Sequence, residues 1–263
     1  MEKSGKKKVE ASVISQKEIA QGIFDMWIAT DLADQAKPGQ FISVYPKDKS
    51  TLLPRPISIC EVEEKKLRIC YRVAGKGTTE LSGYKAQDTI SILGTLGNGY
   101  DLEKADGQHV CLLGGGIGVP PMLQLAKALS QRGKCASISC VMGYRDSHLF
   151  LKEDLEKYAT VYIATEDGSA GTKGNVMDCI AAEKIQPDMM MACGPMPMLR
   201  AIAAYAEKQN IPAYISLEER MACGVGACLG CIVKTKDIDH HSHVNNARIC
   251  TDGPVFLASD LDL

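Results

Sequence analysis

The chain has 263 residues, of which 45% are hydrophobic and 24% are charged, and its formal net charge is −2. This length is sufficient for two compact domains and a smaller appendage, and the near-neutral charge argues against nucleic acid or an anionic membrane as the partner. The eleven cysteines, an odd number, do not resemble a disulfide framework, and we find no signal peptide and no apolar run of membrane-spanning length. We therefore expect a protein of the reducing cytoplasm.

The first part of the chain predicts an antiparallel β-barrel. Short apolar runs alternate there with Gly, Pro and charged pairs, which is typical of strands joined by tight turns. Six strands at this spacing favour a barrel. The expected strands are residues 9–15, 23–30, 41–45, 56–62, 67–73 and 89–93.

Beyond a glycine-rich loop at residues 97–100 the pattern changes to strands that alternate with helices, which predicts a doubly wound parallel sheet. The expected strands are residues 110–113, 137–142, 161–165, 189–192 and 213–216, and the expected helices are 120–132, 149–157, 175–184 and 196–209. We therefore expect three domains: a barrel at 1–98, an α/β domain at 99–217 and a small cysteine-rich domain at 218–263.

Four cysteines in the last of these domains follow a C-x4-C-x2-C spacing with a distal fourth member, the ligand pattern of a plant-type [2Fe-2S] centre. Interleaved glycines let the chain wrap closely and direct backbone N–H groups at sulfur. A structural zinc is the alternative, but zinc ribbons prefer paired C-x2-C knuckles and only one is present. Four buried thiols among so many glycines would also pack poorly as a core. The expected ligands are Cys223, Cys228, Cys231 and Cys250, and the other seven cysteines are not expected to bind metal.

Two short motifs in the predicted barrel fit a flavin dinucleotide. Arg55 opens the sequence Arg-Pro-Ile-Ser and can pair bidentately with a pyrophosphate, while Ser58 can offer its hydroxyl to a flavin ring nitrogen. Further on, a glycine turn that includes Gly77 leads into a helix N-terminus near Thr78, which favours an anionic diphosphate. Taken alone, the first motif better fits a surface arginine before a strand, and the second can be a capped helix after a turn. Their presence in one barrel favours a flavin site.

Two turns are predicted at the carboxyl edge of the parallel sheet, where doubly wound folds bind ligands. One joins a strand to a helix through three consecutive glycines and differs from G-x-G-x-x-G because prolines replace the third glycine. The other is Cys-Gly-Pro, and a simple buried thiol is the alternative for its cysteine. His240, His241 and His243 lie in a polar loop without matching carboxylates, which favours a solvated loop over a metal site.

The order of these motifs resembles the ferredoxin–NADP reductase superfamily. The cysteine segment, Glu-Arg-Met-Ala-Cys-Gly-x-Gly-x-Cys-x-Gly-Cys followed by Cys-x-Asp-Gly-Pro, narrows the resemblance to the electron-transfer subunits of type B dihydroorotate dehydrogenases. The resemblance covers residues 9–256 and implies bound FAD, NAD(H) and a [2Fe-2S] cluster, with no catalytic residue of its own for dihydroorotate. It also implies a partner, an FMN-containing catalytic subunit of pyrimidine biosynthesis, with two copies of each chain.

The resemblance assigns the site residues as follows. Those implied for FAD are Arg55, Pro56, Ile57, Ser58, Cys70, Tyr71, Arg72, Gly77 and Thr78; those for NAD(H) are Gly114, Gly115, Gly116, Ile117, Gly118, Cys193, Gly194 and Pro195; and those for the cluster are Cys223, Cys228, Cys231 and Cys250. Ile57 stands where the superfamily often has tyrosine.

Two other functions remain as alternatives at this point. One is the small subunit of a bifurcating NADH-dependent ferredoxin–NADP oxidoreductase, in which we expect an aspartate to replace one cysteine ligand; Cys223 argues against it. The other is a zinc-stabilised nucleotide-binding regulator without redox turnover, which would be colourless when purified. The choice between NADH and NADPH stays open, because the sequence Gly-Tyr-Arg-Asp at residues 143–146 carries both charges.

Overall fold

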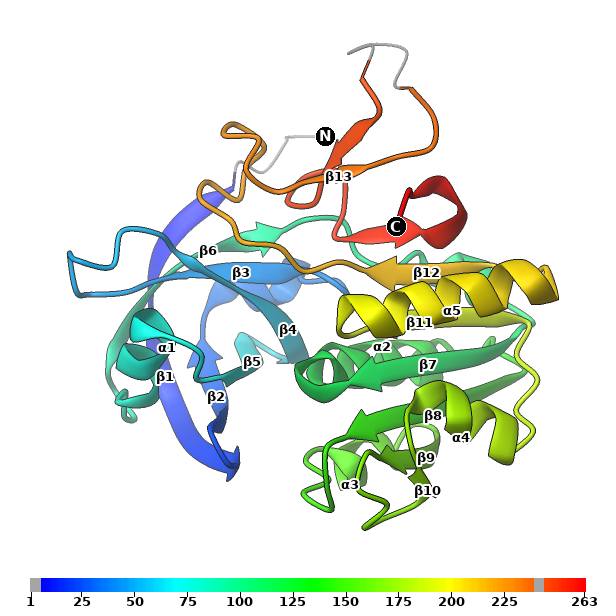
Figure 1. The fold of residues 1–263 in the computed structure, drawn as a ribbon. Helices are drawn as coiled ribbons and strands as arrows, with labels where there is room; N and C mark the ends of the chain where they lie inside the picture. The colour runs from blue at the N-terminus through cyan, green and yellow to red at the C-terminus, as the bar shows by residue number, and fades with distance from the viewer. Residues whose placement is uncertain (1–5, 239–243) are drawn as a thin grey trace.

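The computed structural model describes residues 6–238 and 244–263, and in it the predicted barrel is confirmed. Six antiparallel strands close in the order β1-β2-β5-β4-β3-β6, shown in blue to cyan in Figure 1. The strands are β1 (Lys7–Ala20), β2 (Ile23–Ala29), β3 (Phe41–Tyr45), β4 (Arg55–Glu63), β5 (Lys66–Arg72) and β6 (Thr89–Leu96), with η1 (Asp31–Gln35) and α1 (Lys76–Ser82) in the connections. Alternate side chains such as Ile28, Ile42 and Ile69 point inward and are fully buried, as expected for strands with one face on a core.

The second unit is the predicted doubly wound sheet. Its strand order is β10-β9-β8-β7-β11-β12-β15, parallel except for β15. The elements are η2 (Leu102–Ala105), β7 (His109–Gly115), η3 (Gly116–Gly118), α2 (Val119–Arg132), β8 (Ser137–Tyr144), α3 (Lys152–Leu155), β9 (Thr160–Thr165), β10 (Thr172–Lys173), α4 (Val176–Ala182), β11 (Met189–Cys193), α5 (Met196–Gln209) and β12 (Ala213–Ser216). Helices α4 and α5 cover one face, and α2 and α3 cover the other, which faces the barrel (Figure 1).

One predicted helix is shorter than expected. The sequence predicted a helix over residues 149–157, but α3 extends only from Lys152 to Leu155. Leu151, which precedes it, has a φ of 64°, in the left-handed region that a continuing α-helix cannot accommodate. The residues before α3 therefore form a turn.

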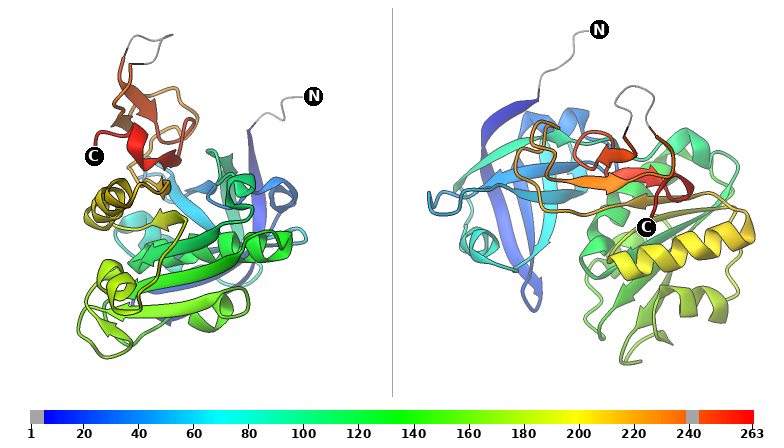
Figure 2. Two further views of the ribbon diagram at one scale, coloured as in Figure 1. Left: turned by 90° about the vertical axis from the view of Figure 1, so that its right-hand side faces the viewer. Right: turned by 45° about the horizontal axis from the view of Figure 1, so that its top comes forward.

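The cysteine-rich segment forms a third, smaller layer above the other two, shown in orange and red in Figures 1 and 2. It contains the two-stranded sheet of β13 (Ile232–Lys234) and β14 (Asn246–Arg248), then β15 (Val255–Leu257) and η4 (Ala258–Asp260). None of these short elements was predicted. Strand β15 pairs antiparallel with β12, so the end of the chain extends the parallel sheet at its edge. The predicted solvated loop with His240, His241 and His243 lies outside the described residues.

The cysteine-rich segment packs against both larger units. Phe41 and Leu96, on the outer face of the barrel, share one apolar core with Cys231 and Cys250. The backbone N–H of Asn98 donates to the carbonyl of Gly253 at 2.6 Å, which ties the loop between the two larger units to this segment. None of the helices in the described ranges combines the length and the apolar character that crossing a bilayer requires.

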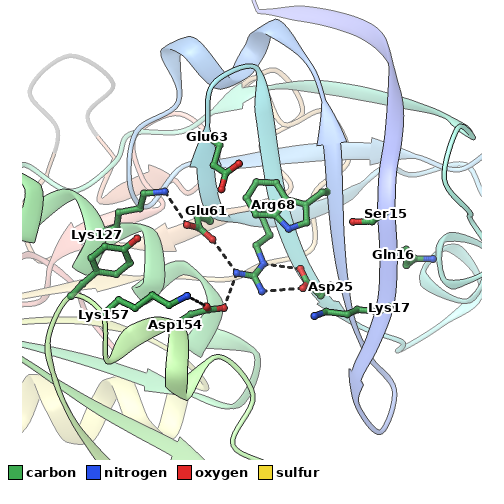
Figure 3. A pocket seen from close by; sticks show the side chains of 12 residues that line it. Ser15, Gln16, Lys17, Asp25, Glu61, Glu63, Arg68, Lys127, Asp154 and Lys157 are labelled. Carbon is green, nitrogen blue, oxygen red and sulfur yellow. Dashed lines mark hydrogen bonds and ion pairs between the residues drawn. The ribbon is translucent and has the colours of Figure 1, made fainter.

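An ion-pair cluster joins the barrel to the helices α2 and α3 of the second unit, which contains the parallel sheet (Figure 3). Arg68 on β5 pairs with Asp25 through Nε and Nη2, at 2.8 and 3.0 Å, and with Glu61 at 3.0 Å. It also reaches Asp154 of α3 at 2.9 Å, while Lys127 of α2 reaches Glu61 at 2.9 Å. These charges line a polar pocket of about 520 Å³ between the two units. The ion pairs are therefore placed to hold the second unit against the barrel.

Candidate electron-transfer site

The loop that carries the first cysteines wraps around the sulfur of Cys223. The backbone N–H groups of Val225, Ala227 and Cys228 donate to Cys223 Sγ at 3.4, 3.3 and 3.4 Å, and the N–H of Gly230 donates to Cys228 Sγ at 3.4 Å. Positive φ angles at Gly224 and Gly226, of 67° and 81°, allow the chain to turn this tightly. Several backbone dipoles therefore converge on one sulfur, as an anionic thiolate ligand requires.

These hydrogen bonds change the acidity of the thiol. Burial raises the pKa of Cys223, but the hydrogen bonds from Val225, Cys228 and Ala227 outweigh it and lower the pKa to about 6. Cys250 behaves in the opposite way, because burial and the neighbouring Cys231 raise its pKa to about 11. A thiolate is the form that binds metal, and the loop stabilises it at Cys223 before any metal is bound.

The four predicted ligands come together as two pairs, Cys223 with Cys228 and Cys231 with Cys250. In the part of the chain that the structure describes, no three His, Cys, Asp or Glu side chains are arranged as a closed single-ion site. A [2Fe-2S] cluster takes two cysteines on each iron, and four thiols in two pairs with backbone donors directed at sulfur fit that donor set. The residues present therefore fit an iron–sulfur cluster.

The loop leaves little room for side chains at two of its glycines, Gly224 and Gly226. A Cβ at Gly226 would lie 2.9 Å from Thr251 Cγ2, and one at Gly224 would lie 3.1 Å from Leu96 Cδ1 and 3.2 Å from Ser43 Oγ. Because Thr251 follows Cys250, the first contact joins the two halves of the cysteine motif. The second contact places the loop directly on the barrel strands β3 and β6.

Of the residues predicted to bind FAD, Arg55 and Gly77 lie in direct contact. A Cβ at Gly77 would be only 2.6 Å from Arg55 Nε and 2.8 Å from Arg55 Cζ, so the guanidinium lies across the glycine backbone. Arg55 Nη1 donates to the carbonyl of Leu53 at 2.5 Å, which orients the side chain. The hydroxyl of Thr78 accepts hydrogen bonds from the N–H groups of Ala74 and Gly75, at 2.9 and 3.2 Å. The start of α1 and the arginine thus form one positively polarised corner.

Three other predicted FAD residues direct their side chains elsewhere. Ile57 points into the barrel core with 6% of its surface exposed. Cys70 Sγ lies 3.6 Å from Cys60 Sγ in the buried contact between the two larger units. The ring of Tyr71 stacks on Phe24 at 5.8 Å, and its hydroxyl donates to Gln16 Oε1 at 2.6 Å. These three residues can therefore contact a flavin through their backbone atoms. Within the same predicted set, Arg72 is exposed, and Pro56 and Ser58 are half-buried.

The two predicted nucleotide turns meet at the carboxyl edge of the sheet. Gly114 and Cys193 are paired in the register of β7 and β11, and a Cβ at Gly118 would lie 2.2 Å from the carbonyl oxygen of Cys193. The helix α2 starts at Val119 with Pro120 in its first turn, as predicted. Pro195 occupies the N-cap position of α5. Cys193 itself is fully buried, and burial raises the pKa of its thiol, so this turn presents backbone to a ligand.

Sequence reasoning missed one charged residue at the junction of these sites. Glu218 follows β12 at the carboxyl edge of the sheet, and its charge acts on both Arg72 and Cys193, which come from the two predicted nucleotide sites. The residue as a whole is exposed to solvent, but the protein around its carboxyl raises the pKa of that group, although Arg72 opposes the shift. Its place just after the last parallel strand of the sheet was the available signal.

The cysteine-rich segment and the parallel sheet each match a family model. Residues 218–262 match the iron–sulfur cluster binding domain of dihydroorotate dehydrogenase B, and residues 112–204 match the oxidoreductase NAD-binding domain. The chain is 41% identical over 258 residues to the electron transfer subunit of dihydroorotate dehydrogenase B (NAD(+)) of Bacillus caldolyticus, covering 96% of this chain and 97% of that one. The chain belongs to the family of dihydroorotate dehydrogenase B electron transfer subunits.

Other relatives agree with this assignment. The electron transfer subunit of Streptococcus mutans is 42% identical over 260 residues, covering 97% of this chain and 98% of that one. Among solved structures, a chain of the NADH-dependent reduced ferredoxin–NADP oxidoreductase is 30% identical with a TM-score of 0.85, covering 96% of this chain and 89% of that one. A ferredoxin–NADP+ reductase from Neisseria gonorrhoeae with bound FAD and NADP is 16% identical with a TM-score of 0.67, covering 81% and 94% of the respective chains. That last likeness shows that dihydroorotate dehydrogenase B electron transfer subunits share the reductase fold.

Proposed function

We propose that this chain passes electrons between NAD(H), FAD, a [2Fe-2S] cluster and a separate FMN-containing catalytic subunit that interconverts dihydroorotate and orotate in pyrimidine biosynthesis. Two copies of each chain would form the complex. Residues 1–98 would hold FAD, residues 99–217 would hold NAD(H) and residues 218–263 would hold the cluster. All eleven cysteines are free thiols, which supports a site of action in the reducing cytoplasm.

One structural relation carries this proposal. Strand β4, which is predicted to contact the flavin, pairs with β3, and β3 packs against the core around the cysteines. Ser58 on β4 is the register partner of Phe41 on β3. Phe41 in turn belongs to the apolar core that contains Cys231 and Cys250. The backbone that would contact the flavin is therefore one strand away from the backbone that would hold the cluster, which suits rapid electron transfer between them.

The chemistry belongs to the cofactors, since FAD exchanges a hydride with NAD(H) and a [2Fe-2S] cluster carries one electron at a time. The chain contributes position and charge. Arg55 offsets the charge of the flavin diphosphate, and the turns at Gly114 and Cys193 bring a dinucleotide against the backbone. The N–H groups directed at Cys223 stabilise the negative charge that a cluster gains on reduction.

Arg55→Ala should yield protein with substoichiometric FAD and a normal iron content. The contact between a guanidinium and a diphosphate is charge-assisted and typically contributes about 1.5–3 kcal/mol. Its loss should therefore weaken FAD binding roughly 10- to 150-fold. Flavin absorbance and iron assays on the same sample measure both quantities. Lys66→Ala, on the exposed end of the neighbouring strand, is the matched control and should keep its flavin. Full flavin occupancy in Arg55→Ala would remove Arg55 from the site.

The isolated chain should reduce artificial acceptors with NADH but should form no orotate from dihydroorotate. Its two larger units are assigned to FAD and to a nicotinamide nucleotide, and neither is assigned a site for dihydroorotate. Addition of the FMN-containing subunit should start orotate formation, which is followed by its ultraviolet absorbance. Dihydroorotate turnover by the purified chain alone would contradict the two-subunit proposal.

A further inference from the structure

Ser43, at the centre of β3, has a buried hydroxyl without a partner. The residue is 0% exposed, and among residues 6–238 and 244–263 its Oγ has no hydrogen-bond partner. A buried hydroxyl that makes no hydrogen bond destabilises a fold, so such groups usually have a partner. Only one other buried side-chain polar atom in the described part of the chain shares this property, Ser91 Oγ on β6.

The hydroxyl of Ser43 points to the outside of the barrel, toward the cysteine loop. Its neighbours Ile42 and Val44 face the barrel core, so the alternation of a strand places Ser43 on the opposite face. On that face it meets Gly224, where a Cβ would lie 3.2 Å from Ser43 Oγ. Gly224 directly follows Cys223, whose sulfur already accepts three backbone hydrogen bonds. The unpaired hydroxyl therefore lies beneath the most strongly polarised part of the loop.

Gly224 leaves this approach open. With a φ of 67° and no side chain, it lets the loop lie directly on β3, next to Ser43. Ser43 also pairs in register with Pro56 of the Arg-Pro-Ile-Ser motif, which places it between the two predicted redox sites. Leu96, the other residue that a Cβ at Gly224 would contact, is apolar and provides no acceptor in its side chain.

We propose that Ser43 donates a hydrogen bond to a sulfur of the [2Fe-2S] cluster beside Gly224, and that this bond raises the reduction potential of the cluster. The inference rests on the proposed function, because it needs the cluster to be present. A donor directed at cluster sulfur stabilises the reduced state more than the oxidised state, since reduction adds negative charge. Ser43 is thus a positioning and tuning residue on the barrel, from outside the cysteine motif.

The test is a redox titration of the complete two-subunit complex, monitored by the electron paramagnetic resonance signal of the reduced cluster. In Ser43→Ala the ratio of reduced to oxidised cluster at a fixed potential should fall roughly three- to tenfold, which is about 28–59 mV for a one-electron couple. Ser91→Ala, which removes the other unpaired hydroxyl on the same barrel, should leave the ratio unchanged. Ser43→Cys, with a weaker donor of similar size, should shift it in the same direction by less and carries the test if the alanine variant loses its cluster.

The outcomes separate this inference from the proposed function. A wild-type complex without a [2Fe-2S] signal would overturn both. A normal signal whose potential is the same in Ser43→Ala and in the wild type would overturn the inference alone. So would a shift confined to the flavin potential, because it would assign the hydroxyl to the flavin.

Discussion

Cys250→Ser should remove the rhombic electron paramagnetic resonance signal of the reduced protein and should lower NADH-linked orotate formation by the complex at least about 100-fold. Loss of a residue that merely supports a metal ligand already costs roughly 10- to 100-fold, and Cys250 is proposed as a ligand itself. Its side chain is buried beside Cys231, and the contact between Thr251 and Gly226 joins it to the loop that carries the other two cysteines. Serine preserves the size of the side chain but supplies a poor ligand for iron.

The same variant should still reduce artificial acceptors with NADH, because FAD is proposed to bind in the barrel. Cys135→Ser is the matched control, since Cys135 is a half-buried thiol of the nucleotide-binding unit far from the cysteine motif in sequence. It should retain both the signal and the turnover. A normal cluster in Cys250→Ser would show that the fourth ligand is misassigned.

The parts of the fold that could be predicted are those with a local signal. Strand β3, helix α5 and strand β12 have the bounds that the sequence predicted, because apolar periodicity and flanking turn residues define each of them. Helix α3 was wrong in length because one backbone conformation, at Leu151, outweighs the helical pattern around it. Strand β15 was missed because its three residues are held by pairing with β12, some forty residues earlier in the chain, and by packing of Phe256 against a distant core.

The candidate site divides in the same way. The cysteine spacing identified the four proposed ligands, since a cluster loop has a local and specific pattern. The contact of Gly224 with Ser43 could not be predicted, because the two residues are about 180 positions apart and neither belongs to a motif that names the other. Glu218 was missed for a related reason: its environment includes Arg72 and Cys193, which belong to two other units. Long-range contacts of this kind depend on how the units pack together.

The ion-pair cluster around Arg68 is another such contact, and Arg68→Met should lower the free energy of unfolding by about 3–5 kcal/mol. Arg68 and Asp25 have only 9% and 2% of their side chains exposed, so removal of the guanidinium leaves a buried carboxylate without its partner. Burial lowers the pKa of Arg68, but hydrogen bonds with Asp25 and Asp154 and nearby negative charge raise it above its usual value, so the group stays charged. Denaturant unfolding followed by circular dichroism measures the effect.

Two comparisons show whether the loss comes from uncompensated charge. Arg68→Met/Asp25→Asn removes both charges and should recover a large part of the stability, because an unpaired buried carboxylate is more destabilising than an unpaired amide. Lys66→Met on the same strand, where the ion pair with Glu63 is exposed, should change stability by less than about 1 kcal/mol. Equal losses in Arg68→Met and the double variant would show that Arg68 stabilises the contact between barrel and nucleotide-binding unit through packing instead of charge.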